Sequence, residues 1–295
     1  MFKFLQVKKT PDTPIPSLGV LTAEWLAKDS ESPIRILQLN NLPDEMKRRA
    51  YRTLLPPGLL ARFKIDLISW KGAEGETLVG LKAEPDTGGV QLWINNPYDL
   101  GDEFFRMELA DNEFNGVDLL FLVLNDPRSP RFATDVDQEG ADTMFGTMRR
   151  NLVEEERALQ AGLAPAQIRA SLSASQITLA QLESFLATLG HRSYALEPLT
   201  YASAWVFEKR GFAYVRGHKL MDDVHREFQP GGRLHAALDG STPFRQPDQW
   251  KNVRGRAWAI HDGILEKIDS RWENLRMIKQ IGRSAGVQTF PEAVY

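Results

Sequence analysis

The sequence of 295 residues contains no cysteine. Disulfides, thiolate metal ligands and a cysteine nucleophile are therefore excluded together, and this composition fits a reducing cytoplasm. Long apolar runs are missing as well, because the longest one, residues 117–124 (VDLLFLVL), is far too short to span a bilayer. No apolar core of signal-peptide length precedes the prolines of MFKFLQVKKTPDTPIP. We therefore expect a soluble cytoplasmic protein.

A strong excess of charge of one sign is also absent. The chain has 36 Lys and Arg against 39 Asp and Glu, a net charge of −3, which gives no reason to expect nucleic acid or an anionic membrane as partner. The sequence has no P-loop, no dinucleotide fingerprint and no Gly-x-Ser-x-Gly elbow. What remains is an ordinary globular composition, 42% hydrophobic and 25% charged.

The first half of the chain predicts an antiparallel meander. A short helix at residues 21–28 and a strand at residues 34–39 (IRILQL) precede a helix at residues 42–55, which Pro56, Pro57 and Gly58 end. Five segments with strand character then follow at short spacing, separated by turn compositions. They are residues 65–70, 77–84, 90–95, 104–109 and 116–124. The last is apolar at nearly every position, which predicts a central strand buried on both faces.

The second half begins with helices. We expect them at residues 142–160, after Pro165, and at residues 175–189, where Gly190 ends the last one. A strand at residues 192–196 (RSYAL) precedes TYASAWVFEKRGF, in which a helix runs directly into another strand. Gly211 is expected to end this helix, and Phe212 to return its side chain to the core.

This junction resembles the GNAT-type N-acetyltransferase fold. In that family a helix reads roughly Asn-x-x-Ala-x-x-Leu-Tyr-Glu-Lys-x-Gly-Phe and turns into a strand. The positions that fall on this pattern are Ala204, Phe207, Glu208, Lys209, Gly211 and Phe212. The resemblance spans residues 34–217 and implies a mixed, mostly antiparallel sheet flanked by helices, with an activity that transfers an acyl group from acyl-CoA to a small molecule.

Two positions depart from the family pattern. Phe207 stands where the family usually has a tyrosine that protonates the leaving thiolate, so Tyr201 is the alternative proton donor on the same helix. The loop that binds acyl-CoA, Gln/Arg-x-x-Gly-x-Gly/Ala, is replaced by PRSPRFATDVDQEGADTMFG, whose carboxylates oppose a pyrophosphate. Arg128 and Arg131 in this loop are candidates to offset that charge.

Further site candidates come from the residue types alone. We expect Glu108, Tyr201 and His261 to remove or supply protons in acyl transfer. Arg245 and Arg254 add positive charge near DGSTPFR, an anion-binding turn candidate that can equally be a structural turn. If the acid and the acyl-CoA loop are both lost, the alternative is a non-catalytic ligand-binding protein on a degenerate GNAT fold.

A second alternative is a metal-dependent enzyme. His218, Asp222 and His225 fall within roughly 60° of one another on a helix, as in a site of two histidines and one carboxylate for a divalent metal. In the alternative to a metal site, Met221 and Val224 form the buried face of this helix, and the polar side chains lie in solvent.

The remaining part of the chain completes the expected architecture. Residues 264–281 predict a helix that packs on the sheet or serves a homodimer interface. We therefore expect an N-terminal arm and GNAT-like α/β core at residues 1–217, followed by an α-rich extension, residues 218–295, packed on that core.

Overall fold

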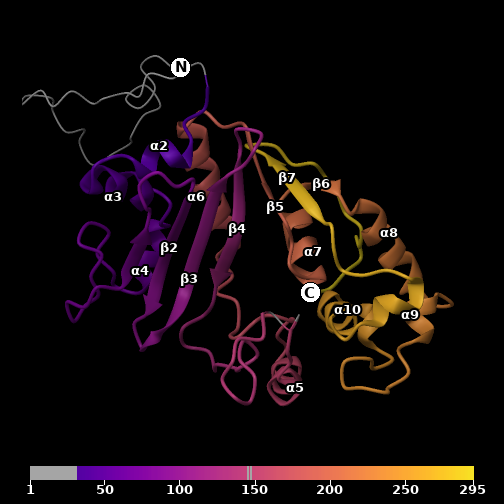
Figure 1. Cartoon of the computed structure of the whole chain (residues 1–295). Helices are drawn as coiled ribbons and strands as arrows, with labels where there is room; N and C mark the ends of the chain where they lie inside the picture. Colours follow the sequence, from indigo (N-terminus) through magenta and orange to yellow (C-terminus); the bar gives the residue numbers. More distant parts are fainter. Residues whose placement is uncertain (1–31, 145, 147) are drawn as a thin grey trace, which may run out of the picture.

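The computed structural model describes residues 32–144, 146 and 148–295, and a seven-stranded sheet runs through it (Figure 1). The strands are β1 (Val79–Lys82), β2 (Gly89–Asn96), β3 (Asp99–Asp111), β4 (Val117–Leu124), β5 (Ser193–Leu196), β6 (Ala213–Arg216) and β7 (Arg276–Gln280). Their order is β1-β2-β3-β4-β5-β7-β6, and every neighbouring pair is antiparallel except β4 and β5. The predicted mixed, mostly antiparallel sheet is confirmed.

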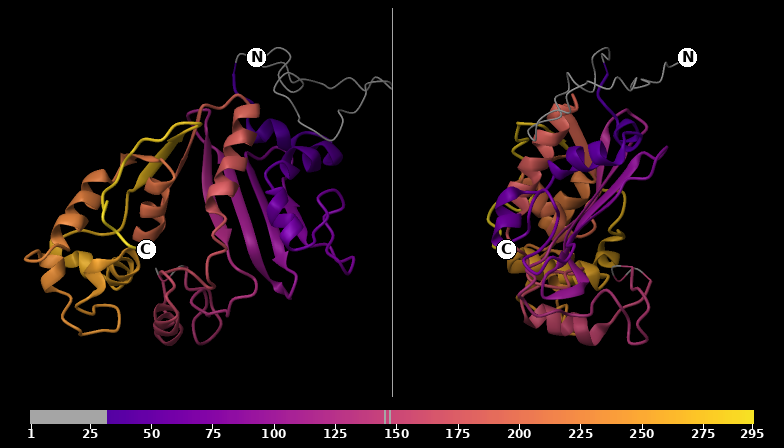
Figure 2. Two further views of the ribbon diagram at one scale, coloured as in Figure 1. Left: turned by 180° about the vertical axis from the view of Figure 1, so that it is seen from behind. Right: turned by 90° about the vertical axis from the view of Figure 1, so that its left-hand side faces the viewer.

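Helices lie around this sheet (Figure 2). They are α2 (Ile36–Asn40), α3 (Asp44–Arg52), α4 (Pro57–Arg62), α5 (Leu152–Gln160), α6 (Ser175–Thr188), α7 (Tyr201–Lys209), α8 (His218–Glu227), α9 (Arg233–Ala236) and α10 (Val253–His261), with 3-10 turns η1 (Gln249–Lys251) and η2 (Ile264–Ile268). Among the described residues, no helix is long and apolar enough to cross a membrane.

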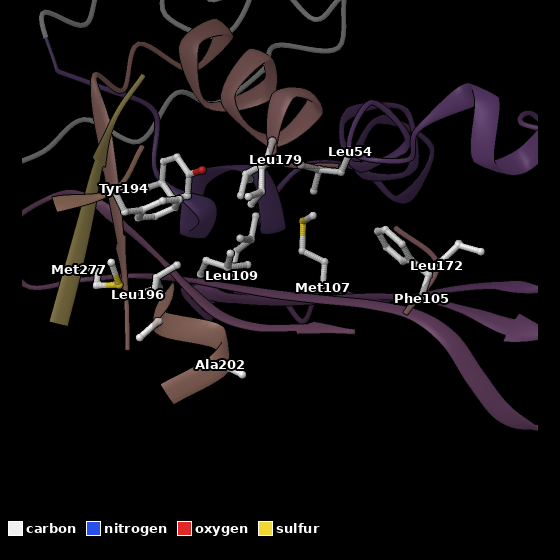
Figure 3. Close-up of a cluster of buried hydrophobic side chains, with 14 of the residues drawn as sticks. Leu54, Phe105, Met107, Leu109, Leu172, Leu179, Tyr194, Leu196, Ala202 and Met277 are labelled. Carbon is white, nitrogen blue, oxygen red and sulfur yellow. The ribbon is translucent and has the colours of Figure 1, made fainter. Parts of the chain in front are cut away.

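The main core forms where the apolar face of the sheet meets α6. Strand β2 alternates as its sequence predicts, with Val90, Leu92 and Ile94 buried and the residues between them half-buried. Leu179 of α6 lies over Met107 and Leu109 of β3, as Figure 3 shows. In the same view α7, marked by Ala202, lies on the side of the strands opposite α6.

The predicted junction between α7 and β6 is confirmed. The hydroxyl of Thr200 accepts a hydrogen bond from the N–H of Ser203 at 3.1 Å and so caps the start of α7. Gly211 has a φ of +84°, and the carbonyl of Gly211 accepts from the N–H of Ala285 at 3.1 Å. Phe212 is fully buried, as its position at the start of the strand predicts.

We expect Gly211→Ala to destabilise the fold by more than backbone strain alone. A left-handed conformation costs an L-residue about 1–2 kcal/mol. A Cβ here would in addition lie 2.8 Å from Oγ and 2.9 Å from Cα of Ser284. The matched control is Gly240→Ala, since Gly240 has a φ of +75° and nothing within 4 Å of its would-be Cβ. Urea unfolding of both variants separates strain from crowding, and equal losses would contradict the crowding.

The strand expected at residues 34–39 is wrong, because this segment forms the short helix α2. The carboxylate of Asp111, at the end of β3, accepts hydrogen bonds from the N–H groups of Ile36 at 2.8 Å and Leu37 at 2.9 Å. This long-range contact satisfies the first donors of the helix and overrides the alternating local pattern.

Four further expectations differ from the structure. Residues 65–70 form turns rather than a strand, and the segment after Pro165 forms turns rather than a helix. The helix expected at residues 142–160 is confirmed only over α5, and the helix expected at 21–28 lies outside the described residues. Strand β4 is central, but its second face is only half-buried, so its burial on both faces is not observed.

The helix expected at residues 264–281 is also wrong. Only η2 is helical, and Asp269 ends it with a φ of +53°. Residues 276–280 then form β7, which lies between β5 and β6. The extension is rich in helices, as predicted, but it also supplies a strand inside the sheet and does not only pack upon it.

Candidate functional site

The two halves of the sheet part at the one parallel strand pair. Strands β4 and β5 pair over Val117–Leu119 and Tyr194–Leu196, and β4 then continues to Leu124. Figure 1 shows the strands separating beyond this point. Within the described residues, no strand pairs with residues 120–123 on the side of β5, until the N–H of Leu172 donates to the carbonyl of Leu124 at 2.9 Å. We call residues 120–123 of β4 and the facing residues 197–200 the strand opening.

A β-bulge lies at the start of the strand opening. Leu109 pairs with Leu119 and Glu108 pairs with Phe121, which leaves Leu120 as the extra residue of β4. Its side chain is 55% exposed, and Leu199 on the facing segment is 49% exposed. Bulges turn side chains away from the regular pleat and are frequent beside binding sites. Exposed apolar side chains therefore border the strand opening on both sides.

Helix α7 begins at the strand opening and leads from it to a buried arginine. Tyr201, the first residue of α7, is buried, and the ring of Trp272 lies edge-on to it at 6.1 Å. Nε1 of Trp272 donates to the carbonyl of Pro198 at 3.2 Å, which fixes this wall of the opening. The hydroxyl of Tyr201 lies 3.5 Å from Nη1 of Arg256 on α10. Burial raises the pKa of the Tyr201 hydroxyl to about 12, so it is protonated at neutral pH.

Arg256 is fully buried, with 0% of its surface exposed. Its Nε donates to the carbonyl of Trp250 at 2.7 Å, and its Nη1 lies 3.2 Å from Nδ1 of His225. Because a guanidinium only donates, Nδ1 of His225 must accept and the imidazole proton sits on Nε2. Burial, together with the charge of Arg256, lowers the pKa of His225. The imidazole of His225 is thus held neutral beside the guanidinium.

The predicted metal triad is not assembled. His218 and Asp222 lie on the exposed face of α8 with Nε2 and Oδ1 3.8 Å apart, whereas His225 turns inward to Arg256. In the part of the chain that the structure describes, no group of three or more His, Cys, Asp or Glu side chains is placed to hold a metal ion. The cation beside Nδ1 of His225 also disfavours a second cation there. The structure therefore does not bring His218, Asp222 and His225 together as the metal interpretation requires.

His261 lies in a different place, an ion network that joins α5 to α10. Its Nε2 is 3.3 Å from Oε1 of the buried Glu155, which also accepts from Arg150. Nη1 of Arg150 donates to Asp262 at 3.0 Å, and Asp262 accepts from Nε of Arg245 at 2.8 Å. Two carboxylates thus alternate with two guanidinium groups. The network pairs its charges internally, which is typical of a structural connection.

Glu108 borders the strand opening from the neighbouring strand. It pairs across the sheet with Phe121 of β4, beside the bulge. Its carboxylate accepts from Nε of Arg106 at 2.6 Å and from the side-chain amide of Gln91 at 3.3 Å. Glu108 and Tyr201 thus lie on elements on the two sides of the strand opening, and His261 belongs to the ion network.

The four arginines predicted to bind a cofactor do not share one location. Arg128 donates to the hydroxyl of Tyr98 at 3.2 Å, and Arg131 pairs with Asp135 at 2.6 Å. Arg245 pairs with Asp262, and Arg254 stacks over the ring of Tyr295 at 4.6 Å. Each has a partner within the chain, so these four side chains do not form a common phosphate site.

Arg256 and Glu155 were not predicted as site residues. Arg256 lies three residues after Val253 and four before Ile260, inside the apolar stripe of α10, where a charged residue signals a buried partner. Glu155 lies three residues before the fully buried Ala158, so it too is a charged residue on the buried side of its helix. Each residue has one partner nearby in sequence, Trp250 or Arg150, but His225 and His261 are distant in sequence and carried no comparable signal.

The chain matches no protein-family model, no curated protein and no solved structure at a significant level.

Proposed function

We propose that the chain is an acyltransferase-like protein of the GNAT type that binds acyl-CoA at the strand opening and acylates a small amine. The observation that carries the proposal is the parting of β4 and β5 after three residue pairs, next to the bulge at Leu120. The motif at the end of α7 and the mostly antiparallel sheet, with its single parallel pair at this point, add support.

The strand opening suits an extended ligand that carries amide groups. A strand edge without a partner presents backbone N–H and C=O groups, which pair readily with an added extended segment. The pantetheine arm of coenzyme A is such a segment, with two amides and a terminal thiol. The exposed side chains of Leu120 and Leu199 provide apolar contacts for its methylene groups.

The proposed reaction needs one proton acceptor and one proton donor. The amine nitrogen attacks the thioester carbonyl, a C–N bond forms, and the C–S bond breaks to release the thiolate. In this proposal the carboxylate of Glu108 takes the proton from nitrogen, through water, and the hydroxyl of Tyr201 protonates the thiolate. The proton is available because burial raises the pKa of the Tyr201 hydroxyl to about 12, which keeps it protonated at neutral pH.

Titration with coenzyme A tests the binding step. Thermal unfolding is measured with acetyl-CoA, with a longer acyl-CoA and with free coenzyme A. A ligand at 100 times its dissociation constant adds about 2.7 kcal/mol to the free energy of unfolding. We expect a saturable increase that requires the coenzyme A moiety, and we expect Leu120→Asp to abolish it because a carboxylate would replace the apolar contact.

Leu100→Asp is the matched control, since Leu100 on β3 is 58% exposed and lies outside the strand opening. It should bind like the wild type. If none of the three ligands stabilises the wild type, the acyl-CoA proposal fails.

The second candidate is a non-catalytic ligand-binding protein. It is favoured by Phe207, which has no proton to donate, and by the carboxylates in place of the acyl-CoA loop. Incubation with acetyl-CoA and a panel of small amines separates the two candidates. Release of free thiol above the hydrolysis blank supports the enzyme, and saturable binding without release supports the binding protein.

A further inference from the structure

Buried arginines in this protein are otherwise paired with carboxylates. Arg169 donates from Nε to Asp102 at 2.7 Å, and the partly buried Arg150 pairs with Glu155 and Asp262. Arg256, the second buried arginine among the described residues, differs from Arg169, because no ion pair joins its guanidinium to a carboxylate. A buried charge without a counter-ion is costly, so the missing anion requires an explanation.

One edge of the Arg256 guanidinium is also without a hydrogen-bond acceptor. Nε and Nη1 have partners, but Nη2 is buried and has none. The flat face of the group is occupied, since the ring of Phe290 lies 3.5 Å and the ring of Phe228 5.3 Å from Cζ. Two N–H bonds therefore point in the plane of the group without an acceptor. This is the geometry that receives a carboxylate oxygen.

The segment 289–295 covers this guanidinium from outside. Phe290 is tied down through its carbonyl, which accepts from Nε1 of Trp205 at 3.2 Å, and Val294 accepts from the N–H of Val253 at 3.0 Å. Between these two anchors Glu292 is 58% exposed, with Oε1 at 3.7 Å from Nε2 of His225. The segment is thus fixed at two points and carries its own carboxylate close to the buried charge.

We propose that Arg256 is a binding residue for a small apolar acid, whose carboxylate pairs with Nη2 beneath Phe290. A single negative charge matches the site, because Arg256 is charged and His225 accepts as the neutral imidazole. The surrounding rings of Phe290, Phe228 and Tyr201 favour an apolar body on the ligand. Entry requires the Phe290 ring to swing away from the guanidinium. The proposal does not rest on acyl-CoA binding, although the site shares Tyr201 with the proposed acyl transfer.

Calorimetric titration with benzoate tests the proposal on the full chain, with acetate and inorganic phosphate as comparison probes. We expect one benzoate site per chain. Acetate should bind there with at least tenfold lower affinity, because it lacks the apolar body. Arg256→Met should lower the affinity for benzoate at least tenfold. Arg254→Met is the matched control on the same helix, because Arg254 stacks on Tyr295, and it should bind like the wild type.

A second variant keeps the proposal testable if Arg256→Met does not fold. Glu292→Gln removes the exposed carboxylate that competes for the same charge, so benzoate should bind more tightly, by about threefold or more. Unchanged affinity in Glu292→Gln would contradict the site beneath Phe290. The proposal is overturned if benzoate does not bind the wild type, if Arg256→Met binds it equally well, or if phosphate binds and benzoate does not.

Discussion

Replacing Trp258 with alanine is expected to lower the free energy of unfolding by about 3–5 kcal/mol, the usual cost of removing a fully buried aromatic side chain. Trp258 on α10 has 0% of its surface exposed and stacks on Phe244 with the ring centroids 5.1 Å apart. Its Nε1 donates to the carbonyl of Leu163 at 2.7 Å. Trp258 therefore connects the segment that follows α5 to the extension, and its replacement by alanine removes these contacts.

Urea unfolding of a graded pair of variants checks this expectation. Trp258→Phe keeps most of the ring volume but leaves the buried carbonyl of Leu163 without its donor, which costs about 1–3 kcal/mol. The alanine variant adds the cavity to that cost. If Trp258→Ala lowers the free energy of unfolding by less than about 1 kcal/mol, α10 does not pack tightly against the segment that follows α5.

Glu155→Ala is expected to be similarly severe, at about 3–5 kcal/mol, because it leaves the partners of a buried ion pair without compensation. Glu155 is almost fully buried and accepts from both Arg150 and His261. The matched control is Glu156→Ala on the same helix, where Glu156 contacts Gln160 at the surface. Urea unfolding of this control should show a change within about 0.5 kcal/mol.

Glu155 should also make the free energy of unfolding depend on pH, with a loss of stability in acid. Burial alone would raise the pKa of Glu155, but the hydrogen bonds from His261 and Arg150 outweigh it and hold the pKa below its ordinary value. The folded state thus binds this proton less readily than the unfolded state, for which the pKa is about 4.3. The stability contributed by Glu155 is present above that value and is lost as the pH falls through the lowered folded pKa.

We therefore expect wild-type stability to decline on acidification from about pH 5. The profile of Glu155→Ala should be flatter over the same range, since the group that titrates is gone. Unfolding curves collected between neutral and acidic pH measure both slopes. Equal slopes for the two proteins would show that other carboxylates govern the acid response.

The sequence predicted those helices and strands whose boundaries depend on residues within the same short segment. The junction of α7 and β6 was predictable because Gly211 and Phe212 specify a helix end and a buried strand start within two residues. Strands β2 and β4 were predictable from their alternation and apolar length. Strand β7 was not, because Leu275 and Ile278 fit a helical spacing as well as a strand, and its partners in β5 lie far back in the sequence.

The candidate site was predictable only in part. Glu108 and Tyr201 were identified by residue type, but their positions beside the strand opening depend on a bulge and on strand pairings that the sequence does not announce. His225 was predicted as a metal ligand, whereas the structure places it against Arg256. Its partner Arg256 lies on another helix, and a guanidinium beside the imidazole disfavours the metal that the spacing on α8 alone allowed.

The position of β7 determines when the second half of the sheet can be completed during synthesis. Strand β5 leaves the ribosome early, yet its partner on the far side is β7, and Ser193 pairs with Gln280. Strand β6 cannot stabilise β5 directly, because it too pairs only with β7. The nascent chain therefore carries an open strand edge at β5 until residue 280 has emerged. Chain stalled before that residue is the form in which we expect aggregation or chaperone binding to be greatest.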